Sequence, residues 1–179
     1  PAESETDPRL VALLDCAVAA TANQAMNYLA TGEAPGRTGN YHPNLTPYQV
    51  FDCSDGYIII ATGNDPQYQR LCRLLGLNDL AEHPDYLTNA DRIANRASLE
   101  AHLMAETGKW TKAELLAGCE REGIPAGPIN DLSEVMADPQ VQARGMQISP
   151  EGVPGVRSPF KFSDADLSLD KDSPKLGKG

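Results

Sequence analysis

Hydrophobic residues recur with a helical period near the start of the chain, where charged residues are scarce. The periodic positions are Leu10, Leu14, Val18, Ala22, Ala25 and Leu29. This spacing predicts one long helix, with Asp7-Pro8 as its start and Gly32 as its stop. No charged residue occurs between Cys16 and Gly32, whereas a solvent-facing helix normally carries charges on its outer side. We therefore expect burial against another domain or a second subunit, or a central position in a self-contained core.

Two extended segments follow a long loop rich in glycine and proline. Loops as long as residues 32–47 are often functional. The alternation after it predicts strands at Tyr48–Cys53 and Tyr57–Thr62, joined by a tight turn at Asp55-Gly56. Three consecutive isoleucines at 58–60 favour a strand covered on both faces.

Capping patterns divide the rest of the chain into short helices. The predicted starts are Asp65-Pro66, Thr88 with Asp91, Thr111 with Glu114, Asp131 with Glu134, and Asp138-Pro139. Their predicted stops include Gly76, Gly108, Gly123 and Gly145. Residues 124–129 are expected to form a rigid extended link, with short extended pieces at 147–148 and 158–162. The predicted fold class is α+β: a small antiparallel sheet with several short helices, preceded by one long helix that belongs to a larger domain.

Composition excludes several classes of function. The 179 residues are 41% hydrophobic, which suffices for a core, and carry a formal charge of -10. This balance argues against nucleic acid, which needs a clustered basic face, but not against an anionic small molecule. No apolar run reaches the roughly 18 residues of a membrane span. The four cysteines lie far apart without metal-ligand spacing, so no metal site is predicted; with no signal peptide they indicate reduced thiols in a cytoplasmic protein.

Candidate chemistry is concentrated in the long loop. His42 stands there between Tyr41 and Pro43 and can contact a substrate, or it can hydrogen-bond its own loop. The other histidines, His83 and His102, are expected at the surface. Residues 36–40, Gly-Arg-Thr-Gly-Asn, can cradle a phosphate or thioester oxygen with backbone N–H groups, although the run lacks the ending of a P-loop.

The sequence offers no obvious catalytic residue. Asp15 is the one carboxylate beside the uncharged helix segment, but no base stands next to it, so we expect it to be solvated or paired. The cysteines have no basic neighbour and are expected to be structural. The four thiols are Cys16, Cys53, Cys72 and Cys119.

Several runs of the sequence, in this order, resemble family III CoA-transferases, a family that includes formyl-CoA transferase, carnitine CoA-transferase and α-methylacyl-CoA racemase. The runs are L-V-A-L-L-D-C-A-V-A, G-N-Y-H-P-N-L-T-P-Y-Q-V-F, S-D-G-Y-I-I-I-A-T-G-N-D, T-N-A-D-R-I-A-N-R, G-I-P-A-G-P-I-N-D-L, D-P-Q-V-Q-A-R-G-M and S-P-F-K-F-S. The resemblance covers nearly all of residues 9–178 and is to the C-terminal part of the family only.

The resemblance implies transfer of CoA between carboxylic acids through an enzyme-bound aspartyl thioester, with the CoA thioester as substrate and no separate cofactor. Its implied substrate contacts are Gly39, Asn40, Tyr41, His42, Pro43 and Asn44. The family loop is glycine-rich in formyl-CoA transferase, and Tyr-His-Pro-Asn here argues against formyl-CoA or oxalyl-CoA.

The resemblance also implies that polypeptide outside this sequence completes the enzyme. The family's nucleophilic aspartate has no counterpart here, and Asp15 matches a later helix, so the chain is expected to be inactive alone. The implied parts are 1–35 (large-domain helix and linker), 36–145 (small domain) and 146–179 (linker returning to the large domain). The expected partners are a second copy, as in the family's interlocked dimers, or a complementing N-terminal chain. Alternatives are part of an α-methylacyl-CoA racemase, or a non-catalytic dimerisation or binding module.

Overall fold

The computed structural model describes residues 12–171 of the chain. Contacts divide these residues into two compact units, one ending at Pro43 and the other beginning at Asn44. Each unit is described by itself. The predicted helix start at Asp7-Pro8 lies outside the described residues.

The first unit contains two helices where the sequence predicts one. α1 (Leu13–Ala20) and α2 (Ala22–Thr31) are separated at Thr21, and Ala22 has a φ of 20°. The hydroxyl of Thr21 donates to the carbonyl of Val18 at 2.7 Å, and the Thr21 amide bonds to the same carbonyl at 3.1 Å. The prediction of a continuous helix is therefore wrong here, because a threonine side chain competes for a helix carbonyl and interrupts the regular ladder.

The structure also tests the predicted helix stop at Gly32 and the predicted burial of this segment. Gly32 adopts φ 76° and its amide bonds to the carbonyl of Tyr28 at 2.7 Å, which confirms the predicted stop. No described residue of α1 or α2 is buried. Leu13 is 88% exposed and Leu29 is 72% exposed. The described residues of these two helices therefore form no buried core of their own.

The second unit is built on the predicted hairpin. β1 (Tyr48–Cys53) pairs antiparallel with β2 (Gly56–Ala61), and Cys53 lies opposite Gly56. The turn is therefore Ser54-Asp55, one residue earlier than predicted. Gly56 has φ 148°, and a Cβ there would lie 2.8 Å from Cδ of Lys112. Both the backbone conformation and the close approach require glycine at this position.

A third strand completes the sheet. β3 (Ala126–Ile129) pairs antiparallel with β2, in the order β1-β2-β3, so the link predicted to be extended at 124–129 is extended over Ala126–Ile129 and also joins the sheet. Pro128 is tolerated because β3 lies at the edge, where a missing N–H costs no ladder bond. Ile58 and Ile60 are fully buried, whereas Ile59 is half-buried, so the sheet is better covered on one face than on the other.

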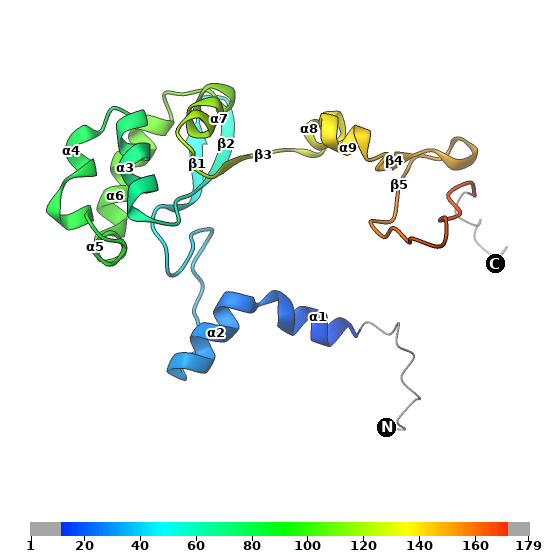
Figure 1. Ribbon diagram of the computed structural model, residues 1–179, viewed down its shortest axis with the longest axis horizontal. Helices are drawn as coiled ribbons and strands as arrows, with labels where there is room; N and C mark the ends of the chain where they lie inside the picture. Colours follow the sequence, from blue (N-terminus) through cyan, green and yellow to red (C-terminus); the bar gives the residue numbers. More distant parts are fainter. Residues whose placement is uncertain (1–11, 172–179) are drawn as a thin grey trace. The chain divides into compact units, whose positions relative to one another are not determined.

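Short helices lie beside the sheet, and two of them pack directly against it (Figure 1). The helices are α3 (Asp65–Leu74), α4 (Asn78–Ala81), α5 (Asn89–Ala94), α6 (Arg96–Thr107) and α7 (Lys112–Arg121), with a 3₁₀ turn at Pro84–Tyr86. α6 packs against β1, and α7 packs against β2 and β3. The capping boxes predicted at Thr88 and Thr111 are both confirmed.

The helix predicted from Thr88 to Gly108 is broken at Asn95 into α5 and α6. The side-chain amide of Asn95 donates from Nδ2 to the carbonyls of Asp85 and Asp91, each at 3.1 Å. A side chain that bonds to nearby backbone in this way favours a helix end over a helix interior.

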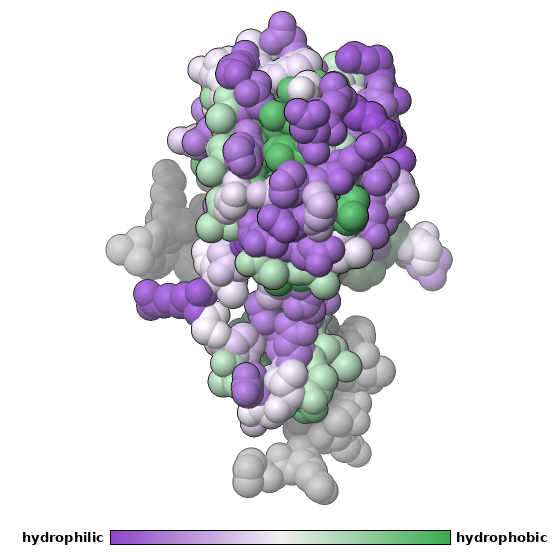
Figure 2. Space-filling model, turned by 90° about the vertical axis from the view of Figure 1, so that its left-hand side faces the viewer, coloured by the Kyte–Doolittle hydropathy of each residue, from purple (hydrophilic) through white to green (hydrophobic). Residues whose placement is uncertain are grey.

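The core of the second unit lies between the sheet and these helices. Its fully buried apolar residues, all without exposed surface, are Phe51, Ile58, Ile60, Tyr68, Leu71, Cys72, Leu99, Leu103 and Leu115. Figure 2 shows the helical side of this unit, where the surface is mainly hydrophilic with isolated hydrophobic residues. The core therefore draws on β1, β2, α3, α6 and α7.

The remaining elements are short and follow β3. They are α8 (Leu132–Ala137), α9 (Pro139–Ala143), β4 (Gln147–Ile148), a 3₁₀ turn at Pro150–Gly152, and β5 (Gly155–Val156), which pairs with β4. The predicted extended piece at 158–162 forms no strand. The chain has the α+β fold class that its sequence predicts. Across residues 12–171, no helix has the length and apolar character required to cross a bilayer.

Candidate functional site

The loop that carries His42 runs across the division between the two units. Gly39 adopts φ 66° in a turn with Asn40. Tyr41 is exposed, and His42 and Pro43 are half-buried. Asn44, the first residue of the second unit, is exposed. The predicted contact residues are thus continuous in sequence and accessible in part.

His42 has a partner on α2 within the first unit. Its Nε2 lies 3.2 Å from Nδ2 of Asn23. An amide nitrogen can only donate, so Nε2 accepts and the proton of the neutral imidazole is placed on Nδ1. This bond joins the histidine to α2, and in this tautomer the ring N–H is at Nδ1.

The chain directly after this loop is held by a side chain of α5. Asn89 donates from Nδ2 to the carbonyl of Asn44 at 2.8 Å, and its Oδ1 accepts from the amide of Thr46 at 3.1 Å. The carbonyl of Pro47 accepts from the Thr62 hydroxyl at 2.6 Å and from the Thr62 amide at 3.1 Å. Four hydrogen bonds from Asn89 and Thr62 therefore hold three backbone groups between Asn44 and Pro47.

A buried arginine holds the same stretch. Arg92 is 1% exposed, and its Nε donates to the carbonyl of Thr46 at 2.7 Å. Its Nη1 donates to the carbonyls of both Tyr86 and Leu87, at 3.0 and 3.1 Å.

Two groups of α3 fix the orientation of the Arg92 guanidinium. Nη2 lies 2.7 Å from Oδ1 of Asp65, and the guanidinium carbon lies 4.5 Å from the ring centroid of Tyr68. A buried charge is tolerated when it is paired and hydrogen-bonded. The arrangement therefore joins α3, α5 and the end of the loop.

The other candidate residues of the sequence are not among the contacts that hold this loop. Residues 36–40 contain a turn at Gly39-Asn40 that no helix follows. Asp15 is exposed in the first turn of α1. His102 is exposed on α6, and His83 is exposed, with Nδ1 accepting from the amide of Asp85 at 3.2 Å. The predicted surface position of both histidines is confirmed.

The cysteines divide by burial. Burial raises the pKa of Cys72 to about 11 and that of Cys119 to about 11, so both are structural thiols. Burial, followed by the charges of Asp55 and Asp52, also raises the pKa of Cys53. Cys16 is exposed on α1. No group of three or more His, Cys, Asp or Glu side chains within residues 12–171 is placed to hold a metal ion.

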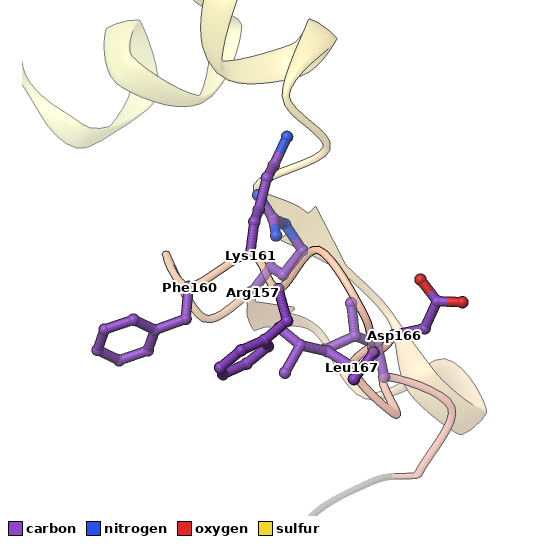
Figure 3. A pocket seen from close by; sticks show the side chains of 8 residues that line it. Arg157, Phe160, Lys161, Asp166 and Leu167 are labelled. Carbon is purple, nitrogen blue, oxygen red and sulfur yellow. The ribbon is translucent and has the colours of Figure 1, made fainter. Parts of the chain in front are cut away.

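Pockets of the described chain are lined by other residues. One of about 450 Å³ is formed by the segment after β5 and includes Arg157, Phe160, Lys161 and Asp166. In Figure 3 Arg157 and Lys161 point to the same side, and Asp166 points away from them. The pocket contains no nucleophile with an adjacent base, the arrangement that covalent catalysis requires.

Sequence reasoning missed Asn89 and Arg92. The run T-N-A-D-R, residues 88–92, predicted a helix start, and that was correct. An arginine one turn into a polar helix gives no sign in the sequence that it will be buried. The available signal was the resemblance of this run to the family, which marked the segment without assigning its residues a role.

Comparisons with known proteins agree with one another. A sequence profile described as CoA-transferase family III matches residues 10–179. The chain is 46% identical over 173 residues to a succinate–glutarate CoA-transferase of Agrobacterium fabrum, covering 94% of this chain and 43% of that protein. It is 37% identical to the succinyl-CoA:glutarate CoA-transferase of Mus musculus, covering 93% and 39%.

A solved structure extends the comparison to the fold. The chain is similar to a CAIB/BAIF family protein from Brucella suis with a TM-score of 0.82 and 55% sequence identity, covering 93% of this chain and 44% of that one. The chain thus spans less than half the length of the relatives it matches. With a family profile matched over nearly its whole length, this chain belongs to CoA-transferase family III.

Proposed function

We propose that this chain is part of an enzyme that moves CoA between an acyl-CoA and a carboxylic acid, and that both acids are dicarboxylic. The observation that carries the proposal is 46% identity, over 94% of the chain, to a protein named for succinate and glutarate. A second relative, 32% identical, is named for succinyl-CoA and mesaconate. A third, 36% identical, is named for acetyl-CoA and oxalate, so only its acceptor acid is dicarboxylic. These names favour a transferase over the alternatives of a racemase or a binding module.

The chemistry proposed is covalent. An aspartate carboxylate attacks the thioester carbonyl and expels CoA thiolate, giving a mixed anhydride. The thiolate re-attacks the aspartyl carbonyl and releases the first acid, leaving an aspartyl–CoA thioester. The carboxylate of the second acid then attacks the aspartyl thioester carbonyl and expels CoA thiolate, giving a second mixed anhydride. The thiolate attacks the second acid's carbonyl in that anhydride, which forms the new acyl-CoA and releases the aspartate carboxylate. Acyl transfers with good leaving groups replace one difficult step. The nucleophile belongs to polypeptide outside this chain, which is inactive alone.

In this proposal the loop Gly39–Asn44 contacts the substrate. His42 supplies a ring donor at Nδ1 because Nε2 is engaged by Asn23. Such a donor suits a substrate carboxylate or the thioester oxygen, which accept hydrogen bonds. Asn44 supplies a second polar side chain beside an anchored backbone.

The proposed partners follow from the exposed apolar side chains of the first unit. Leu13, Leu14 and Leu29 are 88, 74 and 72% exposed, and exposed apolar residues gathered on helices with a single charged residue, Asp15, mark an interface. We propose that they are covered by the rest of the enzyme or by a second copy of the chain. Monodisperse monomer in light scattering of the isolated chain would count against the second-copy form. The limits 1–35, 36–145 and 146–179 and a cytoplasmic location remain predictions.

A chimera tests the proposal. This chain replaces the matching segment of the Agrobacterium fabrum relative, and the parent protein is the positive control. We expect the chimera to exchange CoA between succinyl-CoA and glutarate, and the isolated chain to show no exchange. A folded chimera without exchange, beside an active parent, would overturn the proposal.

The loop has its own variant. His42→Ala in the chimera should raise the KM for the acceptor acid by about tenfold, the effect of losing one hydrogen bond to a charged group. His102→Ala, at an exposed histidine on α6, is the matched control and should leave KM unchanged. Equal KM values in the two variants would exclude His42 from the substrate site.

A further inference from the structure

We propose that Asn89 and Arg92 are positioning residues: together they fix the end of the Tyr-His-Pro-Asn loop, and so set where its substrate-contacting groups stand. The role of the loop in substrate binding rests on the proposed function. The anchor rests only on contacts inside the second unit.

The first support is how the contacts are distributed. Asn89 bonds to the carbonyl of Asn44 and the amide of Thr46, and Arg92 bonds to the carbonyl of Thr46. These two side chains, one helical turn apart on α5, therefore act on three backbone groups within three residues. Thr46 and Pro47 are fully buried, so this point of the chain cannot satisfy its polar groups with water.

The second support is that the anchor is itself held. The guanidinium of Arg92 is braced by Asp65 and by the ring of Tyr68 on α3. Its planar fork makes several bonds in fixed directions, which lysine cannot reproduce. Asn89 is the first residue of α5 and lies between Thr88 and Asp91, the two residues of the capping box that fixes the start of this helix. The Arg92 side chain cannot move without breaking its contacts with α3.

The third support is position along the chain. The first anchored group, the carbonyl of Asn44, is two residues after His42. Because only one residue separates Asn44 from His42, the distance between them can change by only a few ångströms. Loosening Asn44 therefore widens the range of positions open to His42, which weakens the substrate contacts that the loop makes.

The test uses Asn89, because it is only half-buried and its variants should fold. Asn89→Ala removes both bonds. Asn89→Asp is nearly isosteric, still accepts from the Thr46 amide, and suits the positive N-terminal end of a helix, but cannot donate to Asn44. Asn78→Asp makes the same change at the first residue of α4, away from the loop, and serves as the control.

Hydrogen exchange of the 179-residue chain is the first readout. In Asn89→Ala the Thr46 amide should exchange at least about fivefold faster, the expected effect of one lost hydrogen bond, while amides of α5 and α6 keep their rates. In Asn89→Asp the Thr46 amide should change less than in Asn89→Ala. Unchanged exchange at Thr46, or an equal rise throughout α5, would overturn the anchor.

Kinetics of the chimera are the second readout and separate positioning from mere stability. A variant that partly unfolds has fewer active molecules, which lowers kcat and leaves KM alone. A displaced loop weakens substrate contacts, so Asn89→Ala should raise KM by about fivefold with kcat within about twofold. A fall in kcat at constant KM would overturn the positioning role. If the chimera carrying native Asn89 is itself inactive, the proposed function fails, while hydrogen exchange still decides the anchor.

Discussion

Replacing Arg92 by methionine isolates what the buried guanidinium contributes to the second unit. Methionine keeps an unbranched stem and fills irregular space well, so packing along the stem is largely preserved. What disappears is the polar head, with its bonds to the carbonyls of Thr46, Tyr86 and Leu87 and its ion pair with Asp65.

The size of the loss follows from the burial of each partner. The bonds to Thr46 and Tyr86 are buried, and a buried acceptor left unsatisfied costs about 1–3 kcal/mol. The Asp65 side chain is 48% exposed and becomes hydrated when the arginine is removed, so its share is small. Relief from holding a charge in the interior offsets part of the cost. The expected net loss is about 2–4 kcal/mol in the free energy of unfolding.

Urea unfolding followed by fluorescence measures this loss. Trp110 is the single tryptophan and packs partly buried against the core of the second unit, so it reports on the right part of the chain. Arg73→Met makes the same change at an exposed site on α3 and should cost less than about 0.5 kcal/mol. A loss below about 1 kcal/mol for Arg92→Met, or equal losses in both variants, would refute the reasoning.

Three further predictions concern local contacts. Asn64→Ala removes the side-chain cap that accepts from Gln67 at the start of α3 and should cost about 1 kcal/mol in urea unfolding; no measurable loss would contradict the cap. The ion pair with Lys112 lowers the pKa of Glu134 from its ordinary 4.5 and raises that of Lys112 from 10.5. The ion pair therefore stabilises the fold between pH 4.5 and 10.5. This stabilisation is lost as pH falls through the lowered pKa of Glu134 and as pH rises through the raised pKa of Lys112. Glu134→Gln should flatten the plot of urea-unfolding midpoint against pH at its acidic and alkaline ends, and an unchanged plot would disprove the ion pair. With a thiol reagent, the exposed Cys16 should react in the folded chain and Cys72 only after unfolding; mass spectrometry that finds Cys72 labelled first would contradict its burial.

Local patterns predicted the parts of the fold that depend on local physics. The hairpin follows from β-branched residues around a turn, and β1 begins and ends where the sequence indicates. The capping boxes at Thr88 and Thr111 depend on residues three apart, and both are present. By contrast, the break at Asn95 divides the predicted helix into α5 and α6. It depends on bonds from the Asn95 side chain to Asp85 and Asp91 that only the folded chain provides.

Non-local contacts account for what the sequence did not predict. β3 contains Gly127 and Pro128, which are poor strand formers, and it becomes a strand because β2 offers a free edge. The composition of the loop indicated where to look for a site. Its anchor joins Asn89 to Asn44 and Arg92 to Thr46, pairs 45 and 46 residues apart, and no periodicity connects them.

The central claim is that this chain supplies the substrate-contacting loop, while the reacting carboxylate belongs to polypeptide outside it. Peptide mapping by mass spectrometry of the chimera, quenched during turnover with succinyl-CoA, tests this directly. The account predicts a CoA thioester on a carboxylate of the Agrobacterium fabrum segment and none on the peptides of this chain. A CoA thioester on Asp15, or on any other carboxylate of this chain, would contradict it.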